Sequence, residues 1–296
     1  MPELITSPSN PKIKRLLALQ QKSSARRESG LFVVEGRREL QHCLDAGFVV
    51  DSIFVCPSFL SSGSDELPLK TSGCAGPLPQ PSAACPSPLR SRGWLRFSEA
   101  VVASPKEFEV SEDVYAKIAM REGTEGVIAE VRAKERKLEE LALPEHPLIV
   151  VLERVEKPGN LGAVLSSADA AGADAVLICD PLTDLWNPNL IRASIGAVFT
   201  VPCVACSSEA AIAFLKARGI RILTAQLQDS SLYYDCDMTG GTAIVMGTEA
   251  TGLTPVWREA ADAHIRIPML GRLDSLNVSV SAAILLFEAV RQRQNG

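Results

Sequence analysis

Three segments in the C-terminal half of the chain join an apolar run to glycines or polar side chains, a combination that can build a ligand site. The first, Glu153–Gly162, follows the apolar residues Leu148–Leu152. Asn160 is placed to cap a helix that begins here, and the N–H groups at a helix start favour an anionic or carbonyl-bearing ligand. The glycine spacing lacks the first glycine of the dinucleotide fingerprint GxGxxG, so this segment does not indicate a dehydrogenase.

The second segment, Val245–Leu253, runs from an apolar strand into a turn flanked by glycines. Glycines let a ligand approach the backbone closely, and the carboxylate of Glu249 is able to orient a polar group. The same residues also fit a plain strand end that carries a surface glutamate.

The third segment, Ile265–Ser281, leads into an amphipathic helix. A cluster of polar side chains stands at the start of this helix: Ser275, Asn277, Ser279 and Ser281. Capping of helix N–H groups accounts for one or two residues of this kind, but not for all of them. The surplus indicates a binding or catalytic role.

Positive charge is concentrated near the N-terminus, although the whole chain has a net charge of −5. Between Asn10 and Arg38, two acidic residues accompany eight basic ones: Lys12, Lys14, Arg15, Lys22, Arg26, Arg27, Arg37 and Arg38. This run carries +6, which leaves −11 for the rest of the chain. Solvated helix faces would also explain it, but its concentration at one end of an acidic protein favours contact of these residues with a polyanion such as RNA.

Apolar periodicity predicts an α/β unit in the N-terminal region. The expected elements are a helix beginning at Asn10-Pro11, a strand at Leu31–Val34, a helix at Arg37–Ala46, a strand at Val49–Val55, a helix at Ser111–Ile118 and a strand at Gly126–Val131. Residues 61–92 are crowded with Pro, Ser and Gly, a composition typical of a flexible insertion. We therefore predict a first domain over residues 1–131, with this insertion inside it, and a charged linker over residues 132–146.

From residue 147 to residue 296, short apolar strands alternate with helices. The expected strands are Leu148–Leu152, Ala175–Cys179, Ile220–Ala225, Ala243–Met246 and Ile265–Ile267; the expected helices are Leu161–Ala171, Asn189–Ile195, Ser208–Ala217 and Val278–Arg293. This rhythm predicts a mainly parallel sheet with helices on both faces. Ligands of such sheets bind beyond the carboxyl ends of the strands.

Taken in order, the three segments closely resemble the three motifs of the SpoU (TrmH-type) RNA 2′-O-methyltransferases of the SPOUT superfamily. The residues that carry the resemblance are Pro158–Gly162, Met246–Leu253, and Ile267–Met269 with Ser275–Ser279. The N-terminal region, with Ile5–Pro11 and Phe32–Gly36, looks like the ribosomal-protein-like substrate-binding domain that precedes the catalytic domain in many members. The resemblance implies an α/β fold class: a smaller RNA-binding domain followed by a trefoil-knotted parallel-sheet domain.

The resemblance also implies the activity, which is transfer of a methyl group from S-adenosylmethionine to a ribose 2′-hydroxyl of RNA, with ribosomal RNA favoured over transfer RNA. Asn160, Glu249, Ser275 and Asn277 match family active-site positions. Cofactor contacts, largely through backbone groups, would come from Thr224, Ala225, Gly247, Gly252, Ile267, Met269, Leu276 and Ser279. The family works as a homodimer packed through the knotted region, so we expect a homodimer, with no metal.

The match departs from the family pattern at Ser166, where members usually carry an arginine implicated in activating the ribose hydroxyl. Serine is a poor base, so three accounts stay open. Another basic residue, Arg154 or Arg192, takes over this role. Alternatively, the chain is a catalytically weak or inactive homologue that binds RNA and cofactor. In the third account, the arginine matters less than assumed, or Ser166 is a local change in an otherwise standard site.

Other classes of protein receive little support. The N-terminus lacks the basic and apolar pattern of a signal peptide, and no apolar run approaches the length of a membrane helix, so we expect a cytoplasmic protein without membrane contact. The pair Cys203 and Cys206 has CxxC spacing, but no second pair or nearby histidines complete a zinc site. The chain also lacks the GxxxxGK motif of a kinase-type phosphate loop.

Overall fold

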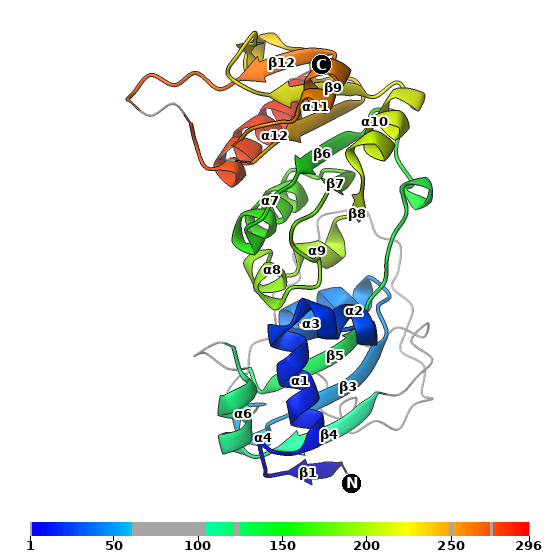
Figure 1. The fold of residues 1–296 in the computed structure, drawn as a ribbon, viewed down its shortest axis with the longest axis vertical. Helices are drawn as coiled ribbons and strands as arrows, with labels where there is room; N and C mark the ends of the chain where they lie inside the picture. The colour runs from blue at the N-terminus through cyan, green and yellow to red at the C-terminus, as the bar shows by residue number, and fades with distance from the viewer. Residues whose placement is uncertain (1, 61–104, 121–124, 249–250, 273–274, 296) are drawn as a thin grey trace. The chain divides into compact units, whose positions relative to one another are not determined.

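The computed structural model describes residues 2–60, 105–120, 125–248, 251–272 and 275–295. The chain divides into two compact units, Met1–Ala133 and Lys134–Gly296, whose elements are labelled in Figure 1. Within the described ranges, no helix is both long and apolar enough to cross a bilayer.

The first unit is built on a five-stranded sheet with the strand order β1-β4-β3-β5-β2. β4 runs parallel to β1 and β3, whereas β5 runs antiparallel to β2 and β3. The strands are β1 (Glu3–Ile5), β2 (Leu31–Glu35), β3 (Val50–Val55), β4 (Lys106–Val110) and β5 (Val127–Arg132). The helices are α1 (Pro11–Gln21), α2 (Ser23–Ser29), α3 (Arg37–Asp45), α4 (Pro57–Leu60) and α6 (Glu112–Ile118).

Local sequence explains how α1 begins and which face it buries. The Asn10 side chain accepts a hydrogen bond from the Lys12 N–H at 2.9 Å, and proline occupies the first helical position. Ile13, Leu16 and Leu19 recur at three-residue intervals and are buried in the core of the unit. The predicted helix start and the predicted strand at Leu31–Val34 are therefore confirmed.

The second unit contains a seven-stranded sheet with the order β10-β12-β9-β11-β6-β7-β8, in which every pair is parallel. The strands are β6 (Leu148–Glu153), β7 (Ala175–Cys179), β8 (Cys203–Cys206), β9 (Arg221–Ala225), β10 (Ser231–Leu232), β11 (Thr242–Met246) and β12 (Ala263–Arg266). The helices are α7 (Pro158–Ala170), α8 (Pro188–Ala193), α9 (Ala197–Thr200), α10 (Ser208–Ala217), α11 (Pro255–Ala260) and α12 (Val278–Asn295), with short 3-10 turns at Leu138–Glu140 and Tyr233–Asp235.

Helices cover this sheet, as the alternating pattern predicts. β6 and β7 are buried at every position, which is expected for parallel strands protected on both faces. Alternate strand residues such as Ile149 and Val151 share a core with α10 and α11. α7 and α12 pack against each other (Figure 1), and α12 also contacts β11. The parallel α/β sheet predicted from the sequence is thereby confirmed.

Two expectations about element boundaries need correction. α8 ends at Ala193 and not at Ile195, because Ile195 and Gly196 both take left-handed backbone conformations, with φ of 54° and 84°. Residues 132–146, predicted as a linker, do not hang free, because Leu138 and Leu141 are buried in the core of the second unit.

Arg293 ties the end of α12 to the amino-terminal edge of the sheet. Its Nη1 donates to the carbonyl of His146 at 2.8 Å, and its Nη2 donates to the carbonyls of Pro147 and Gly240 at 3.1 and 2.7 Å. Its Nε donates to the carbonyl of Met238 at 3.0 Å. Burial lowers the pKa of Arg293, but four carbonyl acceptors compensate the guanidinium for lost water. One side chain thus joins the segments that lead into β6 and β11.

Candidate active site

Two pockets lie beyond the carboxyl ends of neighbouring parallel strands in the second unit. β12, β9, β11 and β6 are consecutive in the sheet, so their carboxyl ends share one edge. The β6–β11 pocket, of about 260 Å³, is lined by Arg154, Val155, Glu156, Lys157, Asn160, Gly247, Thr248, Thr251 and Val278. The β9–β12 pocket, of about 140 Å³, is lined by Ala225, Gln226, Leu227, Ile265, Arg266, Ile267, Met269, Ser275, Leu276, Ser281 and Leu285.

Residues that are close in sequence line both pockets. Ser275 and Leu276 line the β9–β12 pocket, whereas Val278, two residues later, lines the β6–β11 pocket. The segment that enters α12 therefore forms part of both walls. This places a ligand in one pocket close to the segment that bounds the other.

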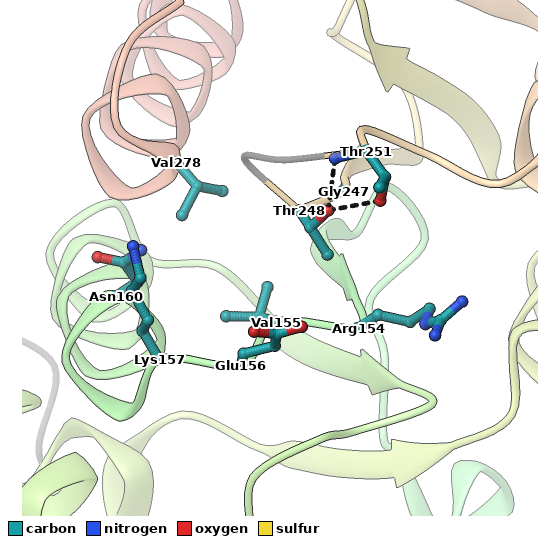
Figure 2. A pocket seen from close by; sticks show the side chains of 9 residues that line it. All are labelled: Arg154, Val155, Glu156, Lys157, Asn160, Gly247, Thr248, Thr251 and Val278. Atoms are coloured by element: carbon teal, nitrogen blue, oxygen red, sulfur yellow. Dashed lines mark hydrogen bonds between the residues drawn. The ribbon is translucent and has the colours of Figure 1, made fainter.

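The β6–β11 pocket is polar and carries charge of both signs. Arg154, Glu156 and Lys157 come from the loop between β6 and α7, and Figure 2 shows Asn160 and Arg154 on opposite sides of the pocket. Arg154 has a left-handed backbone with φ of 53°, and its N–H donates to the carbonyl of Cys179 at 2.9 Å. Its position in a rare backbone region marks this residue as a candidate for function.

A tight turn after β11 forms the opposite wall. The backbone of Gly247 lies so close to Gly252 that a Cβ at residue 247 would stand 2.4 Å from the carbonyl carbon and oxygen of Gly252. The hydroxyls of Thr248 and Thr251 are 2.8 Å apart, and the Thr251 N–H donates to the Thr248 hydroxyl at 3.1 Å (Figure 2). Glycine at position 247 is therefore required for this turn to close.

The carboxylate of Glu153, at the end of β6, fixes the residue that follows this turn. Glu153 is 2% exposed and accepts hydrogen bonds from both the N–H and the hydroxyl of Thr254. Thr254 is the N-cap residue of α11. The loop after β6 and the turn after β11 are thus held by one buried carboxylate.

Asn160 and Asn277 join the starts of two helices. The Asn277 Nδ2 donates to the Asn160 Oδ1 at 3.2 Å, while the Asn277 Oδ1 accepts from the N–H and the hydroxyl of Ser279 at 2.9 and 2.6 Å. Asn277 therefore caps α12 and links it to α7. Asn160, however, does not cap α7, because the helix begins at Pro158 and Asn160 already lies in its first turn. That expectation is wrong.

The β9–β12 pocket has a mainly apolar wall. Its apolar side chains are Leu227, Ile265, Ile267, Met269, Leu276 and Leu285. Gln226 also lines this pocket, but its side-chain Oε1 is buried away from open space and finds no hydrogen-bond partner in the described part of the chain. A mainly apolar slot suits a heteroaromatic ring such as the adenine of S-adenosylmethionine.

The structure places the residues expected at the cofactor in several environments. Ala225, Ile267, Met269 and Leu276 line the β9–β12 pocket with the predicted catalytic Ser275. Gly247 lines the β6–β11 pocket, and Gly252 packs directly on it. Thr224 and Ser279 line neither pocket: Thr224 is fully buried with its hydroxyl 2.6 Å from the His264 Nδ1, and Ser279 bonds to Asn277. Glu249 lies outside the described residues.

Ser166 and the two arginines considered as replacements for the family arginine, Arg154 and Arg192, differ in their positions relative to the pockets. Ser166 is half-buried on α7 and lines neither pocket. Arg192 is exposed on α8, where its Nη2 donates to the Asn189 Oδ1 at 3.2 Å, and it also lines neither pocket. Arg154 is the one of the two predicted replacement arginines that lines the β6–β11 pocket.

In the first unit, several of the basic residues predicted to bind RNA are engaged within the protein. Arg26, predicted to contact RNA, is 5% exposed and donates to the carbonyl of Leu19 at 2.6 Å, so its guanidinium is engaged inside the unit. Arg15 pairs with the buried carboxylate of Glu130, a hydrogen bond that raises the pKa of Arg15. Lys12 pairs with Glu3 at 2.7 Å, and Arg37 donates to the carbonyl of Leu60 at 2.9 Å. Lys14, Lys22, Arg27 and Arg38 are exposed.

Sequence reasoning missed several pocket residues, among them Gln226, Glu156 and Lys157. Glu156 and Lys157 lie within the first predicted segment, and Gln226 directly follows a predicted strand, so their positions were available as a signal. In the described part of the chain, no group of three or more His, Cys, Asp or Glu side chains forms a candidate metal site. Cys203 and Cys206 lie on β8, and the Cys206 sulfur is 4.0 Å from that of Cys179.

Comparison with known proteins matches both units. Residues 147–287 match the SpoU rRNA Methylase family, and residues 10–75 match the MRM3-like substrate binding domain. The 23S rRNA (guanosine-2′-O-)-methyltransferase RlmB of Pseudomonas putida is 39% identical over 177 residues, which cover 57% of this chain and 71% of that protein.

Solved structures agree over nearly the whole chain. An RNA 2′-O ribose methyltransferase has 37% sequence identity and a TM-score of 0.75, with 98% of this chain and 99% of that chain covered. An AdoMet-bound rRNA methyltransferase from Sinorhizobium meliloti has 27% identity and a TM-score of 0.79, with 98% and 97% covered.

Proposed function

The chain belongs to the SpoU rRNA methylase family, and we propose that it transfers the methyl group of S-adenosylmethionine to a ribose 2′-hydroxyl of ribosomal RNA. The observation that carries the proposal is the pair of pockets at one sheet edge, divided by the segment that enters α12. One pocket has an apolar wall and the other has a polar, charged wall. Such a pair suits a cofactor and an RNA nucleotide that must meet at one point.

The β9–β12 pocket would hold the cofactor. Ile267, Met269 and Leu276 would pack on its apolar parts, in line with the contacts that the family resemblance implies. S-adenosylmethionine, when bound, supplies an electrophilic methyl group on a positively charged sulfur. The contribution of the protein is then to align the hydroxyl that receives this group and to stabilise its partial negative charge.

The β6–β11 pocket would hold the nucleotide. Arg154 and Lys157 supply positive charge for the RNA backbone, and Asn160, positioned by Asn277, offers an amide to the ribose. Ser166 cannot polarise the hydroxyl as an arginine does. We assign that role to Arg154, because it is exposed at the pocket wall and can reorient when RNA binds.

A methylation assay tests the function and the role of Arg154 together. The protein is incubated with methyl-labelled S-adenosylmethionine and unmodified ribosomal RNA, and the product is mapped for 2′-O-methyl marks. Wild type is expected to label one ribose, Arg154→Ala to lose at least about tenfold in kcat/KM, and Arg192→Ala to stay near wild type. A wild type that binds the cofactor but labels RNA only after Ser166→Arg would establish the weak-homologue account instead.

The first unit would bind the RNA substrate through its exposed cations Lys14, Lys22, Arg27 and Arg38. This agrees with the match of residues 10–75 to a substrate binding domain. Phosphate contacts of this kind position RNA without reading its sequence. Binding should therefore weaken steeply as salt is raised.

We also propose that the chain forms a homodimer through the second unit. α12 exposes Val280 and Phe287, which are 47% and 49% accessible and stand seven residues apart on one helix face. Exposed apolar side chains in such a row are typical of an interface. Light scattering is expected to give twice the chain mass for wild type and the monomer mass for Phe287→Glu. A wild-type monomer at micromolar concentration would contradict this assignment.

A further inference from the structure

Cys179 and Cys206 face each other at the carboxyl ends of two neighbouring strands. They are register partners in the parallel pairing of β7 with β8, and their sulfurs lie 4.0 Å apart. Since neighbouring strands are about 4.8 Å apart, the Cα atoms of such a pair fall within the range that a disulfide spans. Bond formation therefore needs a rotation of the two side chains and a small shift of the backbone.

The position of β8 allows such a shift. In the described sheet, β8 is an edge strand that pairs with β7 alone. Cys179 is fully buried on β7, whereas Cys206 is half-buried on the edge strand. A small oxidant from the solvent therefore reaches the pair at Cys206.

The electrostatics also make Cys206 the more reactive sulfur. The hydrogen bond from the Cys179 thiol lowers the pKa of Cys206, and this effect exceeds the opposing effect of burial. The same hydrogen bond and burial raise the pKa of Cys179, which stays a protonated donor. Peroxides react with a thiolate and not with a thiol. Cys206 is thus the thiol that is oxidised first, and Cys179 stands beside it to complete a disulfide.

Cys179 also supports the wall of the β6–β11 pocket. Its carbonyl accepts the N–H of Arg154 at 2.9 Å, and its register partner in β6 is Glu153. Arg154 has a left-handed backbone conformation, which persists only where surrounding contacts hold it. A movement of Cys179 toward Cys206 therefore moves the group that holds Arg154.

We propose that Cys179 and Cys206 form a modification site at which a peroxide produces a reversible disulfide, and that this bond slows methyl transfer by displacing Arg154. The slowing rests on the proposed function, whereas the bond forms whatever reaction the pocket supports. The pair thus makes the activity of the protein sensitive to oxidants.

The oxidation proceeds in two steps. The Cys206 thiolate breaks the O–O bond of hydrogen peroxide and becomes a sulfenic acid, and the hydroxide that leaves takes up the proton that Cys206 released. The Cys179 thiol then attacks the Cys206 sulfur, the S–S bond forms, and the oxygen leaves as water with the thiol proton. The two thiols lose two electrons, and the peroxide ends as two molecules of water.

Peptide mapping of the full chain after treatment with hydrogen peroxide tests bond formation. Free thiols are blocked before digestion with trypsin, which places Cys179 in the peptide 155–192 and Cys206 in the peptide 193–216. Wild type is expected to yield these two peptides linked, and dithiothreitol to separate them. Cys206→Ser, which keeps the size of the side chain, should yield no linked pair.

Cys203 offers the matched control, because it lies on the same strand and in the same peptide as Cys206. The two stand three positions apart, so their side chains lie on opposite faces of the sheet. The Cys203 thiol donates to the carbonyl of Val201 at 3.2 Å, and burial raises its pKa to about 12. Cys203→Ser should therefore form the linked peptides as wild type does.

Methyl transfer to ribosomal RNA tests the coupling to Arg154. Oxidised wild type is expected to lose at least about threefold in kcat/KM and to recover with dithiothreitol, a reductant that does not reverse methionine oxidation. Cys203→Ser should respond as wild type, and Cys206→Ser should keep its activity in peroxide. In Arg154→Ala, oxidation should lower kcat/KM no further, because the side chain that it displaces is already absent.

The outcomes separate failure of the inference from failure of the function. Absence of the linked peptides from peroxide-treated wild type overturns the modification site. If the linked protein is as active as the reduced protein, or if oxidation slows Arg154→Ala as much as wild type, the coupling to Arg154 is wrong. If the linked peptides form but reduced wild type transfers no methyl group, the proposed function fails and the modification site stands.

Discussion

The two units of this protein differ in how far residue type predicts residue role. In the second unit, the three motif segments follow strand ends, and each of them contributes residues to the wall of a pocket. In the first unit, the basic run is divided between internal partners and the surface, with Arg26 buried and its neighbour Arg27 exposed. A motif fixes the spacing of residues along a known backbone path, whereas a charge run does not say which face of a helix each side chain occupies.

Replacing Gly247 should lower activity more than any other substitution proposed here, because a side chain at this position of the second unit would overlap the backbone of Gly252. Gly247→Ala puts a Cβ 2.4 Å from the Gly252 carbonyl group, so the turn after β11 must shift. A displacement of this size in a site is expected to lower kcat/KM about 100-fold. Gly240→Ala is the control, since a Cβ there meets nothing within 4 Å. Methyl transfer to ribosomal RNA measures both, and equal rates would refute the close approach as the reason for this glycine.

Two substitutions of Asn277 distinguish its role in capping α12 from its role in positioning Asn160. Asn277→Asp keeps the acceptor that caps α12 but removes the Nδ2 that bonds to Asn160, so stability should hold while kcat/KM falls about tenfold. Asn277→Ala removes both, and should also lower the free energy of unfolding by about 1 kcal/mol. Thermal unfolding and the methylation assay distinguish these cases. Full activity in Asn277→Asp would show that the link to Asn160 is dispensable.

The neighbours Arg26 and Arg27 offer the sharpest test of the first unit. Arg26→Ala removes hydrogen bonds to the carbonyls of Leu19 and Gln20, so the free energy of unfolding should fall by about 2 kcal/mol with little change in RNA affinity. Arg27→Ala should leave stability unchanged. Affinity for RNA should instead drop by a few-fold, and the slope of log K against log salt should lessen by roughly 0.9 or below. Urea unfolding and RNA titrations at several salt concentrations measure both, and a reversed pattern would contradict the burial of Arg26.

Much of the second unit follows from its sequence, because its long apolar runs leave few alternatives. Ala175–Cys179 and Ser208–Ala217 are predicted with the bounds that the structure shows. β8 escapes prediction because it has four residues, two of them cysteines whose spacing suggests a metal motif. α2 escapes because Ser23–Ser29 carries no apolar stripe; its one buried side chain is Arg26. Short elements depend on tertiary partners, which the local sequence does not reveal.

The same distinction applies to the site: features set by local sequence are predicted, and features set by contacts between distant segments are not. The motifs locate Asn160, Gly247 and Ile267, since their neighbours in sequence place them at strand ends. They do not reveal that Asn160 bonds to Asn277 across 117 positions of the chain, nor that Gln226 carries a buried oxygen without a partner among the described residues. Both depend on contacts between segments far apart in sequence, which only the folded backbone brings together.

The contacts of Arg293 have a consequence for the order in which the two units fold while the chain is being synthesised. The segments that it joins, around His146 and Met238, emerge from the exit tunnel long before Arg293 does. Until the last turns of α12 are synthesised, the carbonyls that precede β6 and β11 lack this donor, and the sheet lacks the helix that covers it. The first unit, whose residues are all made by then, can fold during synthesis. Nascent chains arrested before residue 293 should accordingly yield a protease-resistant first unit and a second unit that is still cleaved.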